Sequence, residues 1–213
     1  MPRVRVHGFS ISLDGFGTGE PQTLESPFGH AGERLHDWMI ETASWQGFPK
    51  GRSGFASDLV DRFGQGVGAH IMGRNMFSPH RGPWEDESWQ GWWGDNPPYH
   101  CPTFVMTHHA RPDLEMEGGT TFKFVAGTPA EVLAMAKEAA GDKDVQVSGG
   151  VNTLRNFLRE GLIDEAHIVV TPIVLGRGER LWDGLDNLMD LYELVEAVGL
   201  GNVSHLRLVR RRA

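Results

Sequence analysis

Two adjacent glycines, Gly149 and Gly150, stand between a predicted strand and a predicted helix. They follow the β-branched residues Val145 and Val147, and after them apolar residues recur at helical spacing as far as Leu162. Glycines at such a turn let a ligand approach the backbone with no side chain in between. The free N–H groups of the first helical turn bind anions, for example a dinucleotide pyrophosphate. A tight turn with close helix–strand packing explains the same motif, so both interpretations stay open.

Three other predicted strands also end in small, polar or basic residues. These strand ends are Asp14-Gly15, Gly73-Arg74 and Thr107-His108. Ligands of open α/β sheets bind outside the carboxyl ends of the strands. We therefore expect these ends and the glycine pair to line one cleft.

Strand and helix patterns alternate through the middle of the chain. Strands are predicted at 3–12, 69–73, 103–107, 122–126, 145–147 and 167–174, and helices at 33–42, 55–63, 129–140 and 151–162. Two final strands, 191–198 and 203–209, are expected to pair as a hairpin. The pattern predicts a single α/β domain over residues 1–213, with a mostly parallel central sheet and antiparallel C-terminal strands.

The composition argues against several classes of partner. Lys and Arg total 20 and Asp and Glu total 28, so the formal net charge is −8. Nucleic-acid binding favours a basic surface, and no apolar run is long enough to cross a membrane. The single cysteine, Cys101, cannot form an internal disulfide and suits a reducing compartment. We therefore expect a cytoplasmic protein that binds a small molecule and neither nucleic acid nor a membrane.

The histidines do not indicate a metal site. The chain has 10 histidines, but no pair has the HExxH spacing. His108 and His109 are adjacent, and on a strand adjacent side chains point to opposite faces. We therefore predict no metal ligands.

The segment 78–102 has an unusual composition for a loop. Trp84, Trp89, Trp92 and Trp93 stand among glycines, prolines and acidic residues. A loop of this length in a compact domain is usually functional or disordered. The tryptophans indicate either a functional or subunit contact, or a flap that folds onto the core.

Four motifs occur in order along nearly the whole chain: SISLDGF, IMGRNMF, FVMTHH and VSGGVNTLRNFLREGLIDE. With them the chain resembles the dihydrofolate reductase superfamily, and most of all its RibD C-terminal branch, the reductase domain of riboflavin synthesis. The resemblance implies a three-layer dihydrofolate reductase-like fold and a reductase that takes hydride from NADPH.

The resemblance also implies the residues that bind NADPH. The pyrophosphate would be held by Gly149, Gly150, Val151, Asn152 and Thr153. Gly73 and Arg74 would approach the adenosine side, with Thr107 and His108 on the other side of that group. The guanidinium of Arg74 matches the 2′-phosphate that separates NADPH from NADH.

Two carboxylates are candidates for the catalytic groups. In dihydrofolate reductases a carboxylate of the first helix assists the reaction. The predicted helix offers Glu33, Asp37 and Glu41. Asp37, next to the apolar Trp38, either lies at the cleft edge in that role or is a solvated charge on the helix face. Asp14 lies in an intact Ser-Leu-Asp-Gly motif, where it either binds substrate or caps the turn. Riboflavin-type reductases have lysine and alanine where this chain has Gly8 and Ser10.

The expected activity is that of a 5-amino-6-(5-phosphoribosylamino)uracil reductase-like enzyme that reduces a heterocyclic or imine-like substrate. The alternatives are a dihydrofolate reductase and a nucleotide-binding protein of the same fold without catalysis. The zinc deaminase signature of the bifunctional riboflavin enzyme, H-x-E with P-C-x-x-C, does not occur. The resemblance further implies a homodimer, for which the strand-rich C-terminal end offers an edge or a face.

Overall fold

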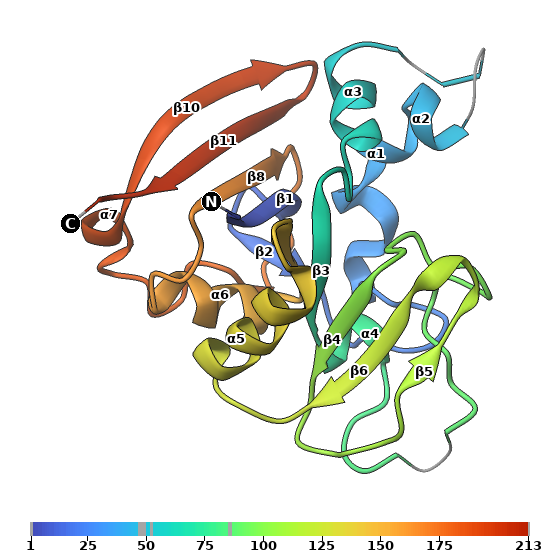
Figure 1. Ribbon diagram of the computed structural model, residues 1–213. Coiled ribbons are helices and arrows are strands. Elements are labelled where there is room, and N and C mark those ends of the chain that lie inside the picture. The colour runs from blue at the N-terminus through green and yellow to red at the C-terminus, as the bar shows by residue number, and fades with distance from the viewer. Residues whose placement is uncertain (1, 47–49, 52, 85–86, 213) are drawn as a thin grey trace.

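A nine-stranded sheet forms the centre of the computed structural model, which describes residues 2–46, 50–51, 53–84 and 87–212 (Figure 1). In spatial order its strands are β10 (Tyr192–Leu200), β11 (Val203–Arg210), β8 (Glu165–Thr171), β1 (Val4–Ser12), β7 (Asp144–Gly149), β3 (Val67–Gly73), β4 (Pro102–Met106), β6 (Thr121–Val125) and β5 (Leu114–Glu115). The six strands from β8 to β6 are parallel, and β10, β11 and β5 are antiparallel to their neighbours. This arrangement confirms the predicted mostly parallel sheet with antiparallel C-terminal strands.

Shorter elements surround this sheet. They are β2 (Phe16–Thr18), β9 (Glu179–Arg180), the 3-10 helices η1 (Gly29–Leu35) and η2 (Glu117–Gly119), and the α-helices α1 (Asp37–Ile40), α2 (Ala43–Gln46), α3 (Phe55–Asp61), α4 (Arg74–Phe77), α5 (Pro129–Ala140), α6 (Val151–Arg159) and α7 (Leu188–Leu191). β2 and β9 pair as a small second sheet. No helix of the described residues is long and apolar enough to cross a membrane.

The helices α5 and α6 cover one face of the sheet (Figure 1). α5 begins with a capping box in which Thr128 and Glu131 satisfy each other's backbone N–H groups. The apolar stripe of α6, including Leu154 and Phe157, is fully buried against the central strands. Burial of this stripe confirms the helix predicted from apolar spacing. The helix ends at Arg159, and Gly161 follows the C-cap in a left-handed conformation with a φ of 64°.

The opposite face of the sheet carries a second, mainly aromatic cluster. Side chains alternate along a strand, so Ile71 of β3 faces α5 and α6 whereas Met72 faces this second layer. Phe77 and Phe122 form its buried centre, and Trp84, Trp89 and Trp93 of the segment 78–102 pack against it. The tryptophan-rich segment is therefore a flap folded onto the core.

The helix predicted over 33–42 is wrong, because the chain breaks at His36 into η1 and α1. Leu35 is fully buried near Phe16 and Leu175. Trp38 instead turns toward β1, where its indole N–H donates to the hydroxyl of Ser10 at 2.9 Å. These two anchors lie in different places, so tertiary contacts override the local helical preference.

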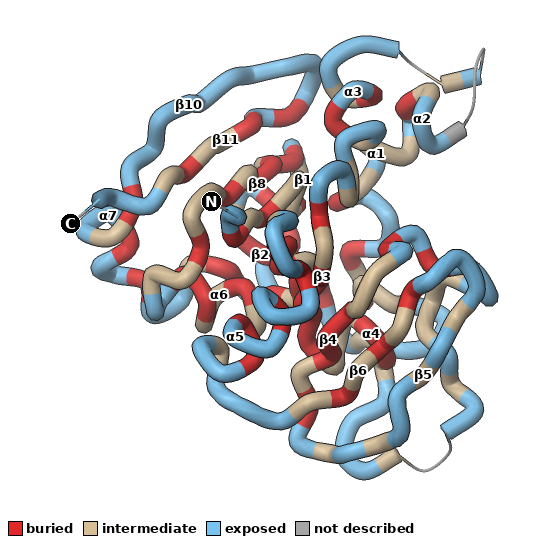
Figure 2. Tube along the Cα trace, viewed as in Figure 1, coloured by how far each residue is buried: buried red, intermediate tan, exposed pale blue. Residues whose placement is uncertain are grey.

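The predicted C-terminal hairpin is confirmed, and its outer strand is the edge of the sheet. β10 pairs antiparallel with β11 from Tyr192 opposite Arg210 to Leu200 opposite Val203. Every residue of β10 after Tyr192 is exposed (Figure 2). The exposed apolar side chains are Leu194, Val195, Val198 and Leu200.

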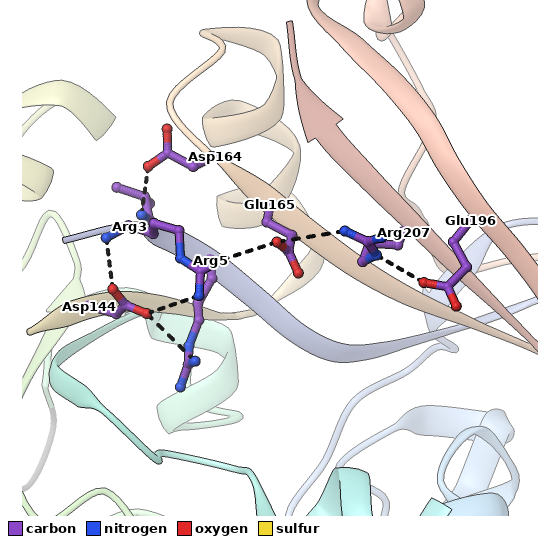
Figure 3. Close-up of polar contacts among 8 residues, drawn as sticks. Arg3, Arg5, Asp144, Asp164, Glu165, Glu196 and Arg207 are labelled. Atoms are coloured by element: carbon purple, nitrogen blue, oxygen red, sulfur yellow. Dashed lines mark hydrogen bonds and ion pairs between the residues drawn. The ribbon is translucent and has the colours of Figure 1, made fainter. Parts of the chain in front are cut away.

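Alternating charges tie the N-terminal strand to its neighbours (Figure 3). From β7 to β10 the charged residues are Asp144, Arg3 and Arg5, Glu165, Arg207 and Glu196. The closest of these ion pairs joins Arg207 to Glu196 at 2.9 Å. Since these side chains are partly exposed, each pair contributes at most about 1 kcal/mol. Their effect is mainly to favour one pairing of the strands.

A histidine is buried at the centre of the second face. His70 of β3 has no exposed surface, and its Nδ1 lies 2.9 Å from the hydroxyl of Ser148. Its Nε2 has no hydrogen-bond partner among the described residues. Burial, and then the charge of Arg5, lowers the pKa of His70 to about 3. Burial also lowers the pKa values of His36 and His167 to about 4.

We expect the free energy of unfolding to fall as the pH is lowered from about 6.5 toward 4. In this window the unfolded chain takes up protons that the buried histidines of the folded protein do not, and each histidine contributes a slope of up to about 1.4 kcal/mol per pH unit. The variant His70→Gln should show a shallower slope in urea unfolding at pH 7, 6 and 5. Parallel pH curves for the variant and the wild type would contradict this assignment.

Candidate functional site

A cavity of about 360 Å³ opens at the carboxyl ends of β3, β4, β6 and β7. It brings together seven of the residues predicted to bind a cofactor, namely Gly73, Arg74, Thr107, His108, Gly150, Asn152 and Thr153. The strand ends expected to share one cleft do so, with the exception of Asp14-Gly15, which lies outside this cavity's lining among the described residues.

Gly149 and Val151, which were also predicted to bind the cofactor, are not among the described residues that line the cavity. Gly149 has a φ of 127°, and a Cβ there would lie 3.1 Å from the ring of Phe9 and 3.4 Å from the sulfur of Met76. The side chain of Val151 is buried in the core. Any contact of Val151 with a ligand would therefore use its backbone N–H.

The N-terminus of α6 forms one wall of the cavity. Gly150 is its N-cap, and no side chain caps the first turn. A Cβ at Gly150 would meet no atom within 4 Å, so the space beside the turn is open. Asn152 and Thr153 of this turn line the cavity. Uncapped N–H groups at a helix start leave hydrogen-bond donors for an anion.

The end of β3 packs against this turn without any gap. A Cβ on Gly73 would lie only 2.3 Å from the hydroxyl oxygen of Thr153. A side chain is therefore excluded at Gly73. The close approach places the next residue, Arg74, beside the start of α6.

Arg74 is a partly buried cation with unused donors. Its Nη1 donates to the carbonyl oxygen of Gly82 at 3.1 Å and lies 3.5 Å from the hydroxyl of Thr107. Its Nε and Nη2 are buried without a hydrogen-bond partner in the described part of the chain. Burial lowers the pKa of Arg74, and the charges of Arg111 and Arg81 lower it further. Because unpaired donors and like charges are unfavourable, this group favours an anion.

Several residues of the cavity were not predicted from the sequence. They are Asn75, Arg81, Gly82, Met106, His109, Gly127, Pro129, Asn156, Phe157 and Glu179. Gly127 could have been found, because it follows the parallel strand β6 as the other glycines follow theirs. Arg81 comes from a loop and Glu179 from the short strand β9, and no local pattern indicated that the fold would bring them to the cavity.

The residues of the cavity fit a dinucleotide with an additional phosphate. The uncapped turn at Gly150 suits a pyrophosphate, and the unpaired donors of Arg74 suit a separate phosphate. Arg81 lines the same cavity and supplies a second positive charge. A dinucleotide with a 2′-phosphate carries negative charge on both of these groups.

Asp14 is held as an ionised hydrogen-bond acceptor. It accepts from the hydroxyl of Ser12 at 2.6 Å and from the backbone N–H groups of Leu175 at 3.1 Å and Gly176 at 2.7 Å. Burial raises the pKa of Asp14, but these hydrogen bonds lower it more, to about 2. Asp14 therefore joins the end of β1 to the loop after β8, and at neutral pH it holds no proton to donate.

Asp37 is exposed at the start of α1. The neighbouring Trp38 points toward β1, and Asp37 is not among the described residues that line the cavity. The break at His36 explains this placement. The catalytic roles of Asp14 and Asp37 stay predictions.

No group of three or more His, Cys, Asp or Glu side chains within the described residues could hold a metal ion. The adjacent His108 and His109 both line the cavity. The carbonyl oxygen of His109 accepts a hydrogen bond from the indole of Trp84 at 3.0 Å, so this strand end also anchors the flap.

Solved structures share the fold of this chain. A protein from Shewanella sp. PV-4 assigned to riboflavin biosynthesis is 22% identical with a TM-score of 0.63, and each chain is covered completely. A diaminohydroxyphosphoribosylaminopyrimidine deaminase/5-amino-6-(5-phosphoribosylamino)uracil reductase from Thermotoga maritima is 11% identical with a TM-score of 0.54. That match covers 99% of this chain and 57% of the Thermotoga chain. RibD from Acinetobacter baumannii is 19% identical with a TM-score of 0.53, over 100% of this chain and 59% of its own.

These neighbours confirm the predicted dihydrofolate reductase-like α/β fold. This chain spans less than two thirds of the Thermotoga and Acinetobacter proteins. A comparison with curated protein sequences finds no match. The model of the RibD C-terminal domain matches residues 5–206. With a match over nearly its whole length and a cavity at the expected strand ends, the chain belongs to the RibD C-terminal domain family.

Proposed function

We propose that this protein is a reductase that binds NADPH in the cavity between β3, β4, β6 and α6. The observation that carries the proposal is the pair of buried, unpaired nitrogens on Arg74 beside the uncapped start of α6. The guanidinium of Arg74 is suited to a phosphate monoester, and the uncapped start of α6 is suited to a pyrophosphate. NADPH has both groups, whereas NADH lacks the phosphate monoester.

Each wall of the cavity has a part in the proposed binding. The backbone around Gly150, with Asn152 and Thr153, would hold the pyrophosphate. Arg74 and Arg81 would bind the 2′-phosphate, and Thr107 would orient Arg74 through its hydroxyl. Bound NADPH supplies hydride, and the chain supplies position and charge.

For the substrate we propose a heterocycle of the 5-amino-6-(5-phosphoribosylamino)uracil class. The proposal is supported by the membership of the RibD C-terminal domain family and by the reductase activity named for the Thermotoga relative. Dihydrofolate is the alternative substrate. A nucleotide-binding protein without catalysis is a second candidate function, favoured by the ionised state of Asp14 and the exposure of Asp37.

A cytoplasmic location belongs to the same proposal. The support is the single cysteine, Cys101, and a family with biosynthetic relatives. The net charge of −8 favours a small-molecule ligand over nucleic acid.

The cofactor prediction is tested by thermal unfolding with NADPH, NADH or no ligand. NADPH at 100 times its Kd should stabilise the protein by about 2.7 kcal/mol, and NADH at the same concentration by much less. Arg74→Ala should remove the preference, because it removes the donors for the 2′-phosphate. The matched control is Arg62→Ala, which changes an exposed arginine of α3's C-terminus. A preference for NADPH that survives Arg74→Ala would refute the role of Arg74.

The substrate prediction is tested by following NADPH oxidation with each candidate substrate. We expect turnover of 5-amino-6-(5-phosphoribosylamino)uracil to exceed turnover of dihydrofolate at least tenfold. Asp37→Asn tests the predicted catalytic role of Asp37: a lower kcat supports that role, and an unchanged kcat shows that this exposed carboxylate is only a solvated charge. Asp14→Asn should lower the Tm because it weakens the contacts to Leu175 and Gly176. NADPH binding without turnover of any heterocycle would favour the non-catalytic candidate.

We also propose that the protein forms a homodimer through the exposed strand β10. An edge strand with four exposed apolar residues is an unusual surface for a monomer, because such edges pair with other strands. Val195→Lys should shift the molar mass measured by light scattering from dimer to monomer. The control Val174→Lys adds the same charge at an exposed loop position and should leave the dimer intact. A wild-type protein that is monomeric at all concentrations would contradict the proposal.

A further inference from the structure

The indole of Trp84 lies against the guanidinium groups of two arginines, one of which, Arg74, lines the cavity. The guanidinium carbon of Arg74 is 3.3 Å from the centroid of the ring, and that of Arg111 is 4.8 Å from it. Trp84 belongs to the tryptophan-rich flap, and the function proposed above gives it no role. A cation over the face of an indole is attracted by the electrons of the ring.

We propose that Trp84 is a positioning residue, which holds the guanidinium of Arg74 in the cavity and so determines the preference for NADPH over NADH. The proposal rests on the function proposed above. Trp84 acts through Arg74 and makes no contact of its own with the ligand.

Few other contacts hold the Arg74 side chain in place. Among the described residues, its hydrogen bonds are one to Gly82 at 3.1 Å and a long one to Thr107 at 3.5 Å. Arg81 and Arg111 repel it, as the lowered pKa of Arg74 reflects after the larger effect of burial. Without the ring, solvent would be the more favourable environment for this cation. The stacking on Trp84 keeps the guanidinium from moving out of the cavity into solvent.

Trp84 is itself fixed from two directions. Its indole N–H donates to the carbonyl oxygen of His109 at 3.0 Å. The edges of its ring meet Phe77 and Phe124, with centroids 6.0 Å and 5.4 Å away. The N–H of His109 in turn donates to the hydroxyl of Thr107 at 3.1 Å, so the ring is tied to the wall of the cavity.

Arg111, which also contacts the ring of Trp84, holds the flap through further hydrogen bonds. Its guanidinium donates to the carbonyl oxygens of Trp89 at 3.0 Å and Glu87 at 2.6 Å. It also lies 4.7 Å from the ring of Phe124. The flap is thus held on the core at the position where Trp84 meets Arg74, which gives this segment a part in ligand recognition in addition to packing.

A role in core packing alone makes a different prediction. If Trp84 only supports the core, its loss should weaken the binding of NADPH and NADH equally, or lower the Tm without a change in the preference for NADPH. If Trp84 positions Arg74, its removal should weaken the binding of NADPH alone, because only NADPH has the phosphate that Arg74 would bind.

The test is the Kd of NADPH and of NADH, measured by calorimetry on the full-length chain. Trp84→Leu removes the aromatic face and should weaken NADPH by about tenfold while leaving NADH unchanged. Trp84→Phe also lacks the indole N–H but keeps an aromatic face, so it should retain most of the preference. Trp84→Met replaces Trp84→Leu if the leucine variant does not fold.

Two further variants provide the controls. Trp92→Leu alters a tryptophan of the same flap that packs on Trp89, at a centroid distance of 4.8 Å, and should leave both Kd values unchanged. The double variant Arg74→Ala/Trp84→Leu should bind NADPH no more weakly than Arg74→Ala, because the two residues act as one unit.

The outcomes separate this proposal from the proposed function. Weaker binding of NADPH but not of NADH in Trp84→Leu, with the affinity for NADPH largely retained in Trp84→Phe, supports the positioning role. Equal loss of both ligands, or an unchanged preference for NADPH where Arg74→Ala removes it, overturns the positioning role and leaves the proposed function standing. A wild-type protein that binds neither ligand overturns both.

Discussion

The contact between Gly73 and Thr153 determines how the site is assembled. A Cβ on Gly73 would stand 2.3 Å from the Thr153 hydroxyl, so the end of β3 touches the first turn of α6 with nothing between them. Two features far apart in the sequence, an arginine after one strand and a helix start after another, become neighbours through this contact. The carboxyl ends of β4 and β6, the next strands of the sheet beyond β3, complete the lining of the cavity.

The electrostatics of the cavity differ from those of the protein as a whole. The chain has a net charge of −8, yet Arg81 and Arg111 lie close enough to Arg74 to lower its pKa, after the larger effect of burial. Bringing like charges together costs free energy, and burying donors without partners costs more. A fold keeps such an arrangement where a ligand provides the missing negative charge. The ring of Trp84 stabilises this arrangement, because it gives the guanidinium groups of Arg74 and Arg111 an aromatic face in place of water.

The acidic groups show how the same residue type can serve structure at one position and remain free at another. Asp14 accepts hydrogen bonds from Ser12, Leu175 and Gly176, and this joins the end of β1 to the loop that follows β8. Asp37 lies exposed, because the chain turns at His36, which buries Leu35 and directs Trp38 toward Ser10 of β1. Neither carboxyl is placed beside the cavity, so the protein provides binding geometry there more clearly than it provides a proton source.

Local patterns in the sequence were sufficient for the elements that depend on local physics. Apolar spacing identified α6, alternating residues identified the C-terminal hairpin, and the glycines at strand ends identified most of one cavity wall. These signals are readable because a helix or a strand buries one face with a fixed period, and because glycine is needed where backbones approach closely. Only the tertiary structure decided the break at His36, the fold of the tryptophan-rich flap and the arrival of Arg81 and Glu179. Each of these depends on contacts between segments far apart in the chain, and no period within a single segment encodes such contacts.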